Sequence, residues 1–558
     1  MRSRLVLLML LTCSAVMLSC ARPGSLGDQS EAPAALTGQI TSAEEGTMEG
    51  VLVSAKKVGS TVAITVVSDQ QGRYNFPRAK LEPGQYVLSI RAVGYDLETG
   101  NTAEVVAEGP TTADLELRKT RDLASQLTNT EWLLSFPGMD EEKASVRGCA
   151  HCHTLGLVTR SKHNAEEFVS VIGRMAGYPP LANPRMPQLR PAERIGAGVP
   201  SPERVQASWQ LQADYLSKVN LSSSLEWTYP LKTLPRPKGR ATQVIYTEYD
   251  LPEATRQPHD VIVDSEGMAW YASFGEQILG KLDPRTGQVT EYEIPLLKPD
   301  APTGILGMRF DKDENPWLAM QFQGGIAKFD KTTETFQTWS LPPELNGPHV
   351  QINQLSPGQS HVDGKVWFQD AGTFNVYRLD IASGEFEVFE PYEIPRPNVY
   401  DVLADSKNNG YFLTMGAGDI GRIDARTGEI NIHKTPTPRS GPRRGRIDSQ
   451  DRVWFAENRG DKIGMFDTQT ESFQEWAPPT PGAWPYDVTP DANGEVWAGG
   501  EYNDRILRLD PRTNEFTEYL LPKQTNVRRV FVDNSTTPVT FWVGSNHGAS
   551  IVKLEPLD

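Results

Sequence analysis

The sequence predicts a mainly β multidomain protein with three folded parts: an N-terminal β-sandwich, a small all-α domain and a seven-bladed β-propeller. Three observations lead to this fold class. Short alternating apolar runs separated by Gly and Pro turns fill residues 35–120, helical periodicity follows over residues 121–222, and a unit of about 40 residues repeats over residues 241–558. A chain of 558 residues also exceeds the size of a single core, so several domains are expected.

Composition bears on the class of partner. Hydrophobic residues make up 38% of the chain and charged residues 23%, as in ordinary globular proteins, so the chain is expected to fold. The formal net charge is −16, whereas nucleic-acid binding requires a basic face. Nucleic acid is therefore not expected as a partner.

Residues 1–20 have the pattern of a secretory signal peptide, because two arginines precede a short apolar run. The run ends in a Met-Leu-Ser-Cys sequence that looks like a lipobox, so Cys20 is the predicted lipidation site, and cleavage near Ala21 is the alternative. Residues 21–34 are predicted to be a linker. We therefore expect an exported protein, in the periplasm or at the outer membrane or cell surface, whose membrane contact is a lipid anchor alone.

Two motifs organise residues 35–120. Residues 69–76 read D-x-x-G-x-Y-x-F and residues 81–86 read L-x-P-G-x-Y, and each joins a turn to an alternating strand. This pair resembles carboxypeptidase regulatory-like domains, which have a transthyretin-like sandwich. The resemblance implies a structural or adhesive accessory domain without catalytic residues.

Residues 121–222 carry two helical patterns. Asn164 is a predicted N-cap, and the apolar residues that follow it up to Met175 recur on one helix face. A second helix is expected over residues 202–219. Residues 223–240, which contain several prolines and basic residues, are predicted to be a linker.

The motif that carries chemistry is C-x-x-C-H at Cys149, Cys152 and His153. Two thiols at this spacing add to the vinyl groups of one haem, and the adjacent His becomes the proximal iron ligand. A thioredoxin-like redox pair is the alternative, but no βαβ pattern surrounds the motif. The sequence therefore predicts one covalent haem c with its iron. The segment also resembles class I cytochromes c, including a closing helix that reads Ala-Asp-Tyr-Leu over residues 213–216.

The sixth iron ligand has several candidates. Met175 ends an apolar helix face, and we favour it. Met186 precedes a proline in a loop, which is where the distal methionine of the cytochrome family usually lies. His163 or an open position are further alternatives, and either methionine has core packing as its commoner role.

The propeller is predicted from seven aromatic markers at equivalent positions, which are Trp270, Trp317, Trp367, Tyr411, Trp454, Trp497 and Trp542. The seventh unit lacks an outer strand before the chain ends at Asp558. Residues 247–252 match the outer strands of other units, so we expect this early segment to complete blade seven and close the ring.

Residues 242–558 resemble the virginiamycin B lyase (streptogramin lyase) group, through repeats such as Pro-His-Asp at 258–260 and Trp-Phe-Ala-Glu at 454–457. The resemblance implies an elimination across an ester, with a His general base, Mg²⁺ and a nearby carboxylate. The required His after Glu457 is Arg459 here, and the Pro-His position one blade earlier is Asn398. The resemblance thus implies the fold more than the reaction.

His547 occupies the corresponding loop of blade seven, but Ser545 stands where the family has Glu and Tyr486 where it has the preceding His. We also expect the residue after each inner-strand proline, or its equivalent, to face one channel mouth. These residues are His259, Thr303, His349, Asn398, Arg443, Tyr486 and Arg528. We choose His259, His349, Arg443 and Arg528 as a candidate pocket for an anionic or polar ligand, and a solvated rim is the alternative.

The leading hypothesis is an exported redox protein, in which haem-mediated electron transfer is coupled to a propeller that binds or oxidises a small-molecule substrate or docks a redox partner protein. The alternatives are a streptogramin lyase-like C–O lyase with an accessory cytochrome, and a surface binding or sensing module. Substrate-dependent haem reduction would separate the first hypothesis from the others.

Overall fold

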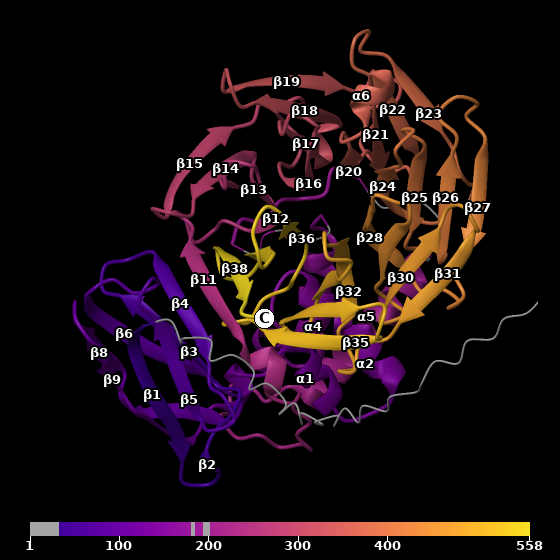
Figure 1. Cartoon of the computed structure of the whole chain (residues 1–558). Helices are drawn as coiled ribbons and strands as arrows, with labels where there is room; N and C mark the ends of the chain where they lie inside the picture. The colour runs from indigo at the N-terminus through magenta and orange to yellow at the C-terminus, as the bar shows by residue number, and fades with distance from the viewer. Residues whose placement is uncertain (1–32, 180–182, 184, 193–200, 395) are drawn as a thin grey trace, which may run out of the picture.

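A computed structural model describes residues 33–179, 183, 185–192, 201–394 and 396–558. The predicted signal peptide, Cys20 and nearly all of the 21–34 linker lie outside the described residues. Figure 1 shows a β-sandwich beside a ring-shaped propeller, and the helices α1, α2, α4 and α5 at the lower part of the ring in this view. The protein is therefore mainly β and multidomain, with an N-terminal β domain and a propeller.

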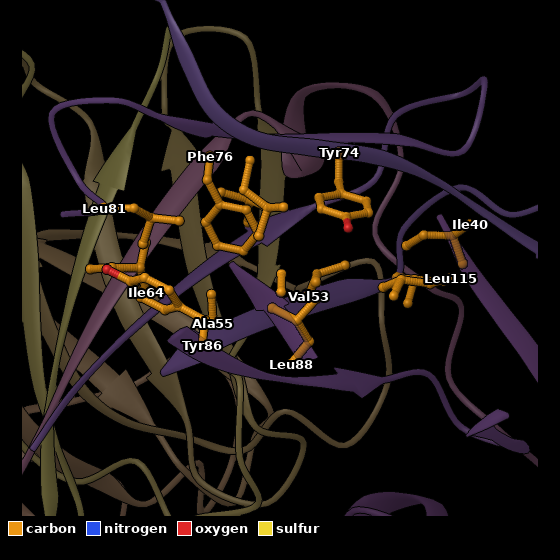
Figure 2. Packing of buried hydrophobic residues seen from close by; sticks show 14 of the residues in the cluster. Ile40, Val53, Ala55, Ile64, Tyr74, Phe76, Leu81, Tyr86, Leu88 and Leu115 are labelled. Carbon is orange, nitrogen blue, oxygen red and sulfur yellow. The ribbon is translucent and has the colours of Figure 1, made fainter. Parts of the chain in front are cut away.

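The sandwich has a core built from the two sequence motifs. Tyr74 and Phe76 from the first motif, and Leu81, Tyr86 and Leu88 from the second and its strand, are all buried in one cluster (Figure 2). Alternation along the strands places these side chains inward. The strands are β1 (Ala34–Ser42), β2 (Gly46–Thr47), β3 (Leu52–Lys57), β4 (Val62–Val67), β5 (Arg73–Pro77), β6 (Gly84–Arg91), β7 (Tyr95–Thr99), β8 (Thr102–Val105), β9 (Thr111–Thr112) and β10 (Leu115–Lys119).

The helical segment contains both predicted helices. Asn164 caps α4 (Ala165–Ala176) in a reciprocal capping box, since its side chain accepts from the Glu167 N–H at 3.0 Å. The closing helix is α5 (Pro202–Val219), with Tyr215 and Leu216 buried. The other elements are η1 (Leu123–Ser125), α1 (Asn129–Ser135), α2 (Asp140–Arg147), η2 (Gly148–His151) and α3 (Leu155–Thr159). No helix among the described residues is long and apolar enough to cross a membrane.

The predicted linker at 223–240 has no strand or helix before η3 (Gly239–Thr242), yet it is firmly packed. The Trp227 ring lies 5.1 Å from that of Trp132 in α1, and the Leu234 N–H donates to Glu131 at 2.9 Å. Arg236 donates to the Glu49 carbonyl of the sandwich at 3.0 Å. This segment therefore joins the helices to the sandwich as a fixed spacer.

Blades one to six are four-stranded sheets whose strands follow chain order from the channel outward. Their bounds are β12 (Pro258–Val263), β13 (Ala269–Ser273), β14 (Ile278–Asp283), β15 (Gln288–Glu293), β16 (Ile305–Phe310), β17 (Pro316–Met320), β18 (Gly325–Asp330), β19 (Thr335–Ser340), β20 (Ile352–Ser356), β21 (Lys365–Asp370), β22 (Val376–Asp380), β23 (Phe386–Phe389), β24 (Val399–Ala404), β25 (Gly410–Thr414), β26 (Asp419–Ile423), β27 (Ile430–Lys434), β28 (Pro442–Ile447), β29 (Val453–Glu457), β30 (Lys462–Asp467), β31 (Ser472–Trp476), β32 (Pro485–Pro490), β33 (Val496–Gly500), β34 (Arg505–Asp510) and β35 (Glu515–Leu520). Short helices η4 (Gln321–Gln323) and α6 (Ser360–Asp363) lie in blades two and three.

Blade seven is completed as the repeat predicts. Strand β11 (Val244–Asp250) pairs antiparallel with β38 (Ser550–Pro556), which follows β36 (Val530–Asp533) and β37 (Thr540–Ser545). The second edge of β11 is not exposed, because it pairs with β4 of the sandwich from Ile245↔Val66 to Tyr249↔Val62. Blade seven and half of the sandwich thus form one eight-stranded sheet, a connection that the sequence did not indicate.

Candidate functional site

The channel-facing positions are marked by an irregular start to each inner strand in blades one to six. The pairing register of these strands shifts after their first residue, for example between Pro258 and Asp260 in blade one. The residues within these shifts include His259, Tyr400, Arg443 and Tyr486. A bulge re-aims the side chain of the extra residue, and here four bulges bring side chains from blades one, four, five and six together.

Tyr486 lies at the centre of this group. Its hydroxyl is 3.2 Å from Nε2 of His259 and hydrogen bonds to the hydroxyl of Tyr400. The Arg443 guanidinium lies 3.8 Å from the centre of the Tyr486 ring, and that of Arg528 lies 5.0 Å from it. All five residues are buried. We call His259, Tyr400, Arg443, Tyr486 and Arg528 the Tyr486 cluster.

Glu501 supplies the negative charge of the cluster. It accepts from Arg443 at 2.7 Å, pairs with Arg528, and accepts from Asn458 at 3.0 Å. Burial raises the pKa of Glu501, but the charges of Arg443 and then Arg528 outweigh this effect and lower the pKa to about 2. The carboxylate is therefore ionised at neutral pH.

Ion pairs join the inner strands of different blades next to the cluster. Arg444 of blade five forms a bidentate pair with Asp260 of blade one, at 2.7 and 2.8 Å, and Asp260 also contacts Nδ1 of His259 at 2.8 Å. Arg446 forms a second such bidentate pair with Asp487, and Arg309 donates from a single nitrogen to both carboxylate oxygens of Asp401. The channel is thus occupied by paired charges at this level.

The C-x-x-C-H segment is anchored over this cluster. Arg528 donates to the His151 carbonyl at 2.7 Å, and the Asn526 side chain donates to the Ala150 carbonyl. Nε2 of His151 lies 3.9 Å from the Glu501 carboxylate. Burial lowers the pKa of His151 to about 3, so this imidazole is neutral and the contact is not an ion pair at neutral pH.

The motif residues differ in their hydrogen bonding and protonation. Cys149 accepts from the Gln212 side chain of α5 at 3.6 Å, and burial raises the pKa of its thiol to about 12, so it is protonated. No disulfide joins Cys149 and Cys152 among the described residues. Nδ1 of His153 is buried and makes no hydrogen bond within the described part of the chain.

His547, in the turn after β37, is a second imidazole at this interface. Both of its ring nitrogens are buried, and no hydrogen-bond partner for them lies among the described residues. Burial lowers the pKa of His547 to about 3, with smaller contributions from the charges of Arg528 and His153. The propeller therefore places the uncharged imidazole of His547 close enough to His153 for the two groups to interact electrostatically.

The three candidate sixth ligands lie in different settings. Met175, at the end of α4, is 40% exposed, and Met186 is 44% exposed. The loop that carries Met186 is fixed to the propeller, because Gln188 accepts from the Thr303 N–H at 2.8 Å. Nδ1 of His163 lies 3.8 Å from the carboxylate of Glu167. Both methionines remain candidates.

Three of the predicted ring residues precede their inner strands and so do not occupy the bulge positions. His349 precedes β20 and its carbonyl packs against Gly372, where a Cβ would lie 1.6 Å away. The equivalent bulge residue of blade three is Asn353. Thr303 and Asn398 likewise precede their strands, because in blades two to four the proline stands before the strand and not at its first residue. Of the four residues of the predicted pocket, His259, Arg443 and Arg528 therefore lie together in the Tyr486 cluster, whereas His349 does not belong to it.

Sequence reasoning missed Tyr400 and Glu501, and it left a solvated rim as an alternative. The arginines that it found are buried and paired, so a solvated rim is wrong for them.

Two described cavities lie outside the cluster. One of about 390 Å³ is lined by Trp132, Thr154 and Gln524 among others, and a much smaller one is lined by Thr525 and Ser545 among others.

The fold and the site together define a mainly β protein with a virginiamycin B lyase-like propeller whose mouth is covered by a helical C-x-x-C-H segment. The model of the virginiamycin B lyase family matches residues 400–556, and that of the carboxypeptidase regulatory-like domain matches residues 35–118. These matches support both resemblances seen in the sequence. No curated protein matches the chain.

Similar solved structures include virginiamycin B lyase from Staphylococcus aureus, at 23% identity and a TM-score of 0.48, covering 56% of this chain and 99% of that one. A streptogramin B lyase structure has 22% identity and a TM-score of 0.49, and covers 57% and 99%. The extracellular domain of a putative hybrid two-component system from B. thetaiotaomicron has 14% identity and a TM-score of 0.42, and covers 55% and 39%.

The positions that the lyase resemblance singles out are not arranged for its reaction. Glu457 is buried, neither carboxylate oxygen has a hydrogen-bond partner among the described residues, and burial raises its pKa to about 7. Arg459, where the resemblance expects the His base, is exposed and its side chain lies over Gly441. A cation at this position is unable to accept a proton.

Proposed function

We propose that this chain is an exported c-type cytochrome that exchanges electrons with a small-molecule substrate or a redox partner protein at the propeller mouth. Cys149 and Cys152 hold one haem c, and His153 ligates its iron. One observation carries the proposal: the C-x-x-C-H segment is anchored over the Tyr486 cluster by Arg528 and Asn526. The motif and this placement support it.

The residues present fit a covalent haem in three respects. The two cysteines keep their thiols, and His153 follows them directly, with its Nδ1 buried and not engaged in a hydrogen bond among the described residues. On α4, Val169 and Ile172 pack partly buried against the helical core and Met175 is 40% exposed, so part of this apolar face is open. A haem has apolar faces of the right character for this surface.

The chain's own residues then have defined tasks. Haem c, when bound, supplies one-electron chemistry at iron. The two cysteines fix its position, while Arg528 and Asn526 hold the backbone of Ala150 and His151 against the propeller. With haem bound, the apolar residues of α4 would shield it from water, and a methionine from α4 or from the Gln188 loop would be the sixth ligand.

Covalent attachment is tested by expression in the presence of a haem-attachment system. We expect one haem per chain that resists extraction with acid acetone, because each cysteine forms a thioether bond. Cys149→Ser/Cys152→Ser is expected to leave no covalent haem, while Cys149→Ser alone leaves one attachment. Wild-type haem that acid acetone removes would overturn the proposal.

Ligation is tested by the weak sulfur-to-iron absorption band of ferric haem. We expect six-coordinate low-spin haem whose band disappears in Met175→Ala and persists in Met186→Ala. The converse result would assign the loop methionine, and a wild-type spectrum without the band would exclude methionine ligation.

A second candidate is a streptogramin lyase-like C–O lyase or a binding module, with the cytochrome as an accessory. The family match over residues 400–556 favours it. A solved relative is described as catalytically inactive virginiamycin B lyase with quinupristin. Incubation of the purified chain with quinupristin, followed by mass spectrometry, tests this candidate. A linearised product would establish a lyase, whereas binding without ring opening would indicate a binding module.

A further inference from the structure

Three arginines that the proposed electron transfer does not use converge beside the motif. Arg147 ends α2, two residues before Cys149, and its guanidinium lies 5.1 Å over the Trp484 ring. Arg459 follows β29, and its side chain packs closely over Gly441, 3.0 Å from the position that a Cβ would take there. Arg439 is two residues before Gly441, and it is exposed, as Arg459 is.

Hydrogen bonds bring the three segments that carry these arginines together. The Arg459 N–H donates to the carbonyl of Ser440, the residue after Arg439, at 2.8 Å. Asn458 donates to the Trp484 carbonyl at 3.0 Å, so the ring under Arg147 adjoins the turn that carries Arg459. Consistent with this proximity, partial burial lowers the pKa of Arg459, and the charges of Arg147, Arg443 and Arg439 lower it further.

The nearby carboxylates are already engaged. Asp461 accepts from the N–H groups of Gly482 at 2.7 Å and Trp484 at 2.6 Å, and Glu501 pairs with Arg443 and Arg528 of the Tyr486 cluster. Glu475 pairs with Lys462 at 2.6 Å. Within the described part of the chain, no ion pair includes Arg147, Arg439 or Arg459.

The positive charge of these three arginines contrasts with the whole chain, which carries a net charge of −16. Like charges that share a small surface repel one another, and a bound anion removes this cost. The planar fork of a guanidinium matches carboxylate and phosphate oxygens in two-point contacts. Three such forks on neighbouring segments therefore suit an oxyanion.

We propose that Arg147, Arg439 and Arg459 form a binding site for the carboxylate or phosphate group of a small molecule, at the junction of α2 and blade five. Its occupant is either a free ligand or a propionate of the haem that the proposed function attaches nearby. The site itself is present whether or not haem is attached, so its test does not depend on that proposal.

The test titrates inorganic phosphate into the full chain at constant ionic strength and follows tryptophan fluorescence and binding heat. Wild type is expected to bind saturably, and Arg439→Ala/Arg459→Ala to bind about tenfold more weakly, because two charge-assisted contacts are lost. The matched control is Arg285→Ala/Arg512→Ala, since both are exposed arginines that pair with their own neighbouring Asp283 and Asp510.

Two arms distinguish the occupant. Equal binding to the haem-loaded chain and to haem-free Cys149→Ser/Cys152→Ser would assign the site to a free ligand. Binding to the haem-free chain alone would assign it to a haem propionate. No saturable binding to either form, or a double arginine variant that binds as well as wild type with its circular dichroism unchanged, would overturn the proposal.

Discussion

Glu501 is a single buried carboxylate that serves two guanidiniums from different blades. Arg443 belongs to blade five and Arg528 to blade seven, and both bond to Glu501 between them. Arg528 also holds the His151 carbonyl of the C-x-x-C-H segment. Removal of this carboxylate would leave two buried cations without a partner, which is far more costly than loss of an exposed ion pair.

The first prediction concerns Glu501→Gln. The pKa of Glu501 is about 2 in the fold against an ordinary value of 4.5, so its stabilising effect is complete above pH 4.5 and is lost as the pH falls towards 2. We expect the substitution to lower the free energy of unfolding by about 3 kcal/mol at pH 7 and by clearly less at pH 3, measured by urea titration. Glu515→Gln, at an exposed position of β35, is the control. An equal loss at both pH values would contradict the assignment.

The repeat placed some cluster residues correctly for a simple physical reason. In blades one, five and six the proline is the first residue of the inner strand, so His259, Arg443 and Tyr486 fall on the bulge. In blade four the strand begins at Val399, after the proline, and the bulge residue is Tyr400. A bulge is a pairing between strands, which one strand's sequence does not display.

Strand β11 differs from the other outer strands by its surroundings, not by its sequence. Thr-Glu-Tyr occurs in β11, β15 and β35 alike, yet only β11 of these three pairs with a sandwich strand. The helices α4 and α5, by contrast, were predicted from apolar spacing and an N-cap, which are local signals. Local pattern thus predicted α4, α5 and the propeller role of β11, whereas the second partner of β11 depends on contacts between domains.

The second prediction tests β11 with a proline. Thr247 pairs with Lys553 of β38 and with Ile64 of β4, so Thr247→Pro disturbs two ladders. We expect it to lower the free energy of unfolding by at least about 3 kcal/mol, whereas Thr338→Pro, in the sheet-ending strand β19, costs less. Thermal unfolding followed by circular dichroism compares them. Equal losses would show that the second ladder of β11 adds no stability.

At the scale of the whole molecule, the sandwich and propeller are joined by side chains as well as by the shared sheet. Arg91 of β6 pairs with Asp504 at 2.5 Å and donates to the Leu521 carbonyl at 2.6 Å. Lys80 pairs with Glu555 of β38 at 2.6 Å. Such contacts, in addition to β-sheet hydrogen bonds, favour joint unfolding of the two domains.

The third prediction is a single calorimetric transition in which sandwich and propeller melt together. Arg91→Ala should lower its midpoint by a few degrees, because it leaves Asp504 buried with its principal cation removed, at a cost of about 3 kcal/mol. Lys57→Ala, which removes a pair with exposed Glu82 inside the sandwich, is the control and should have little effect. Two resolved wild-type transitions would refute the coupling.

The pairing of β11 with β4 also has a consequence for the order of folding during synthesis. Chains are made from the N-terminus, and β38 begins at Ser550, three hundred residues after β11 ends at Asp250. Throughout that interval β11 lacks its propeller partner, and an unpaired strand is a site for aggregation. The sandwich is already complete, and β4 offers β11 a ladder at once. We therefore expect β4 to pair with β11 on the nascent chain before blade seven emerges.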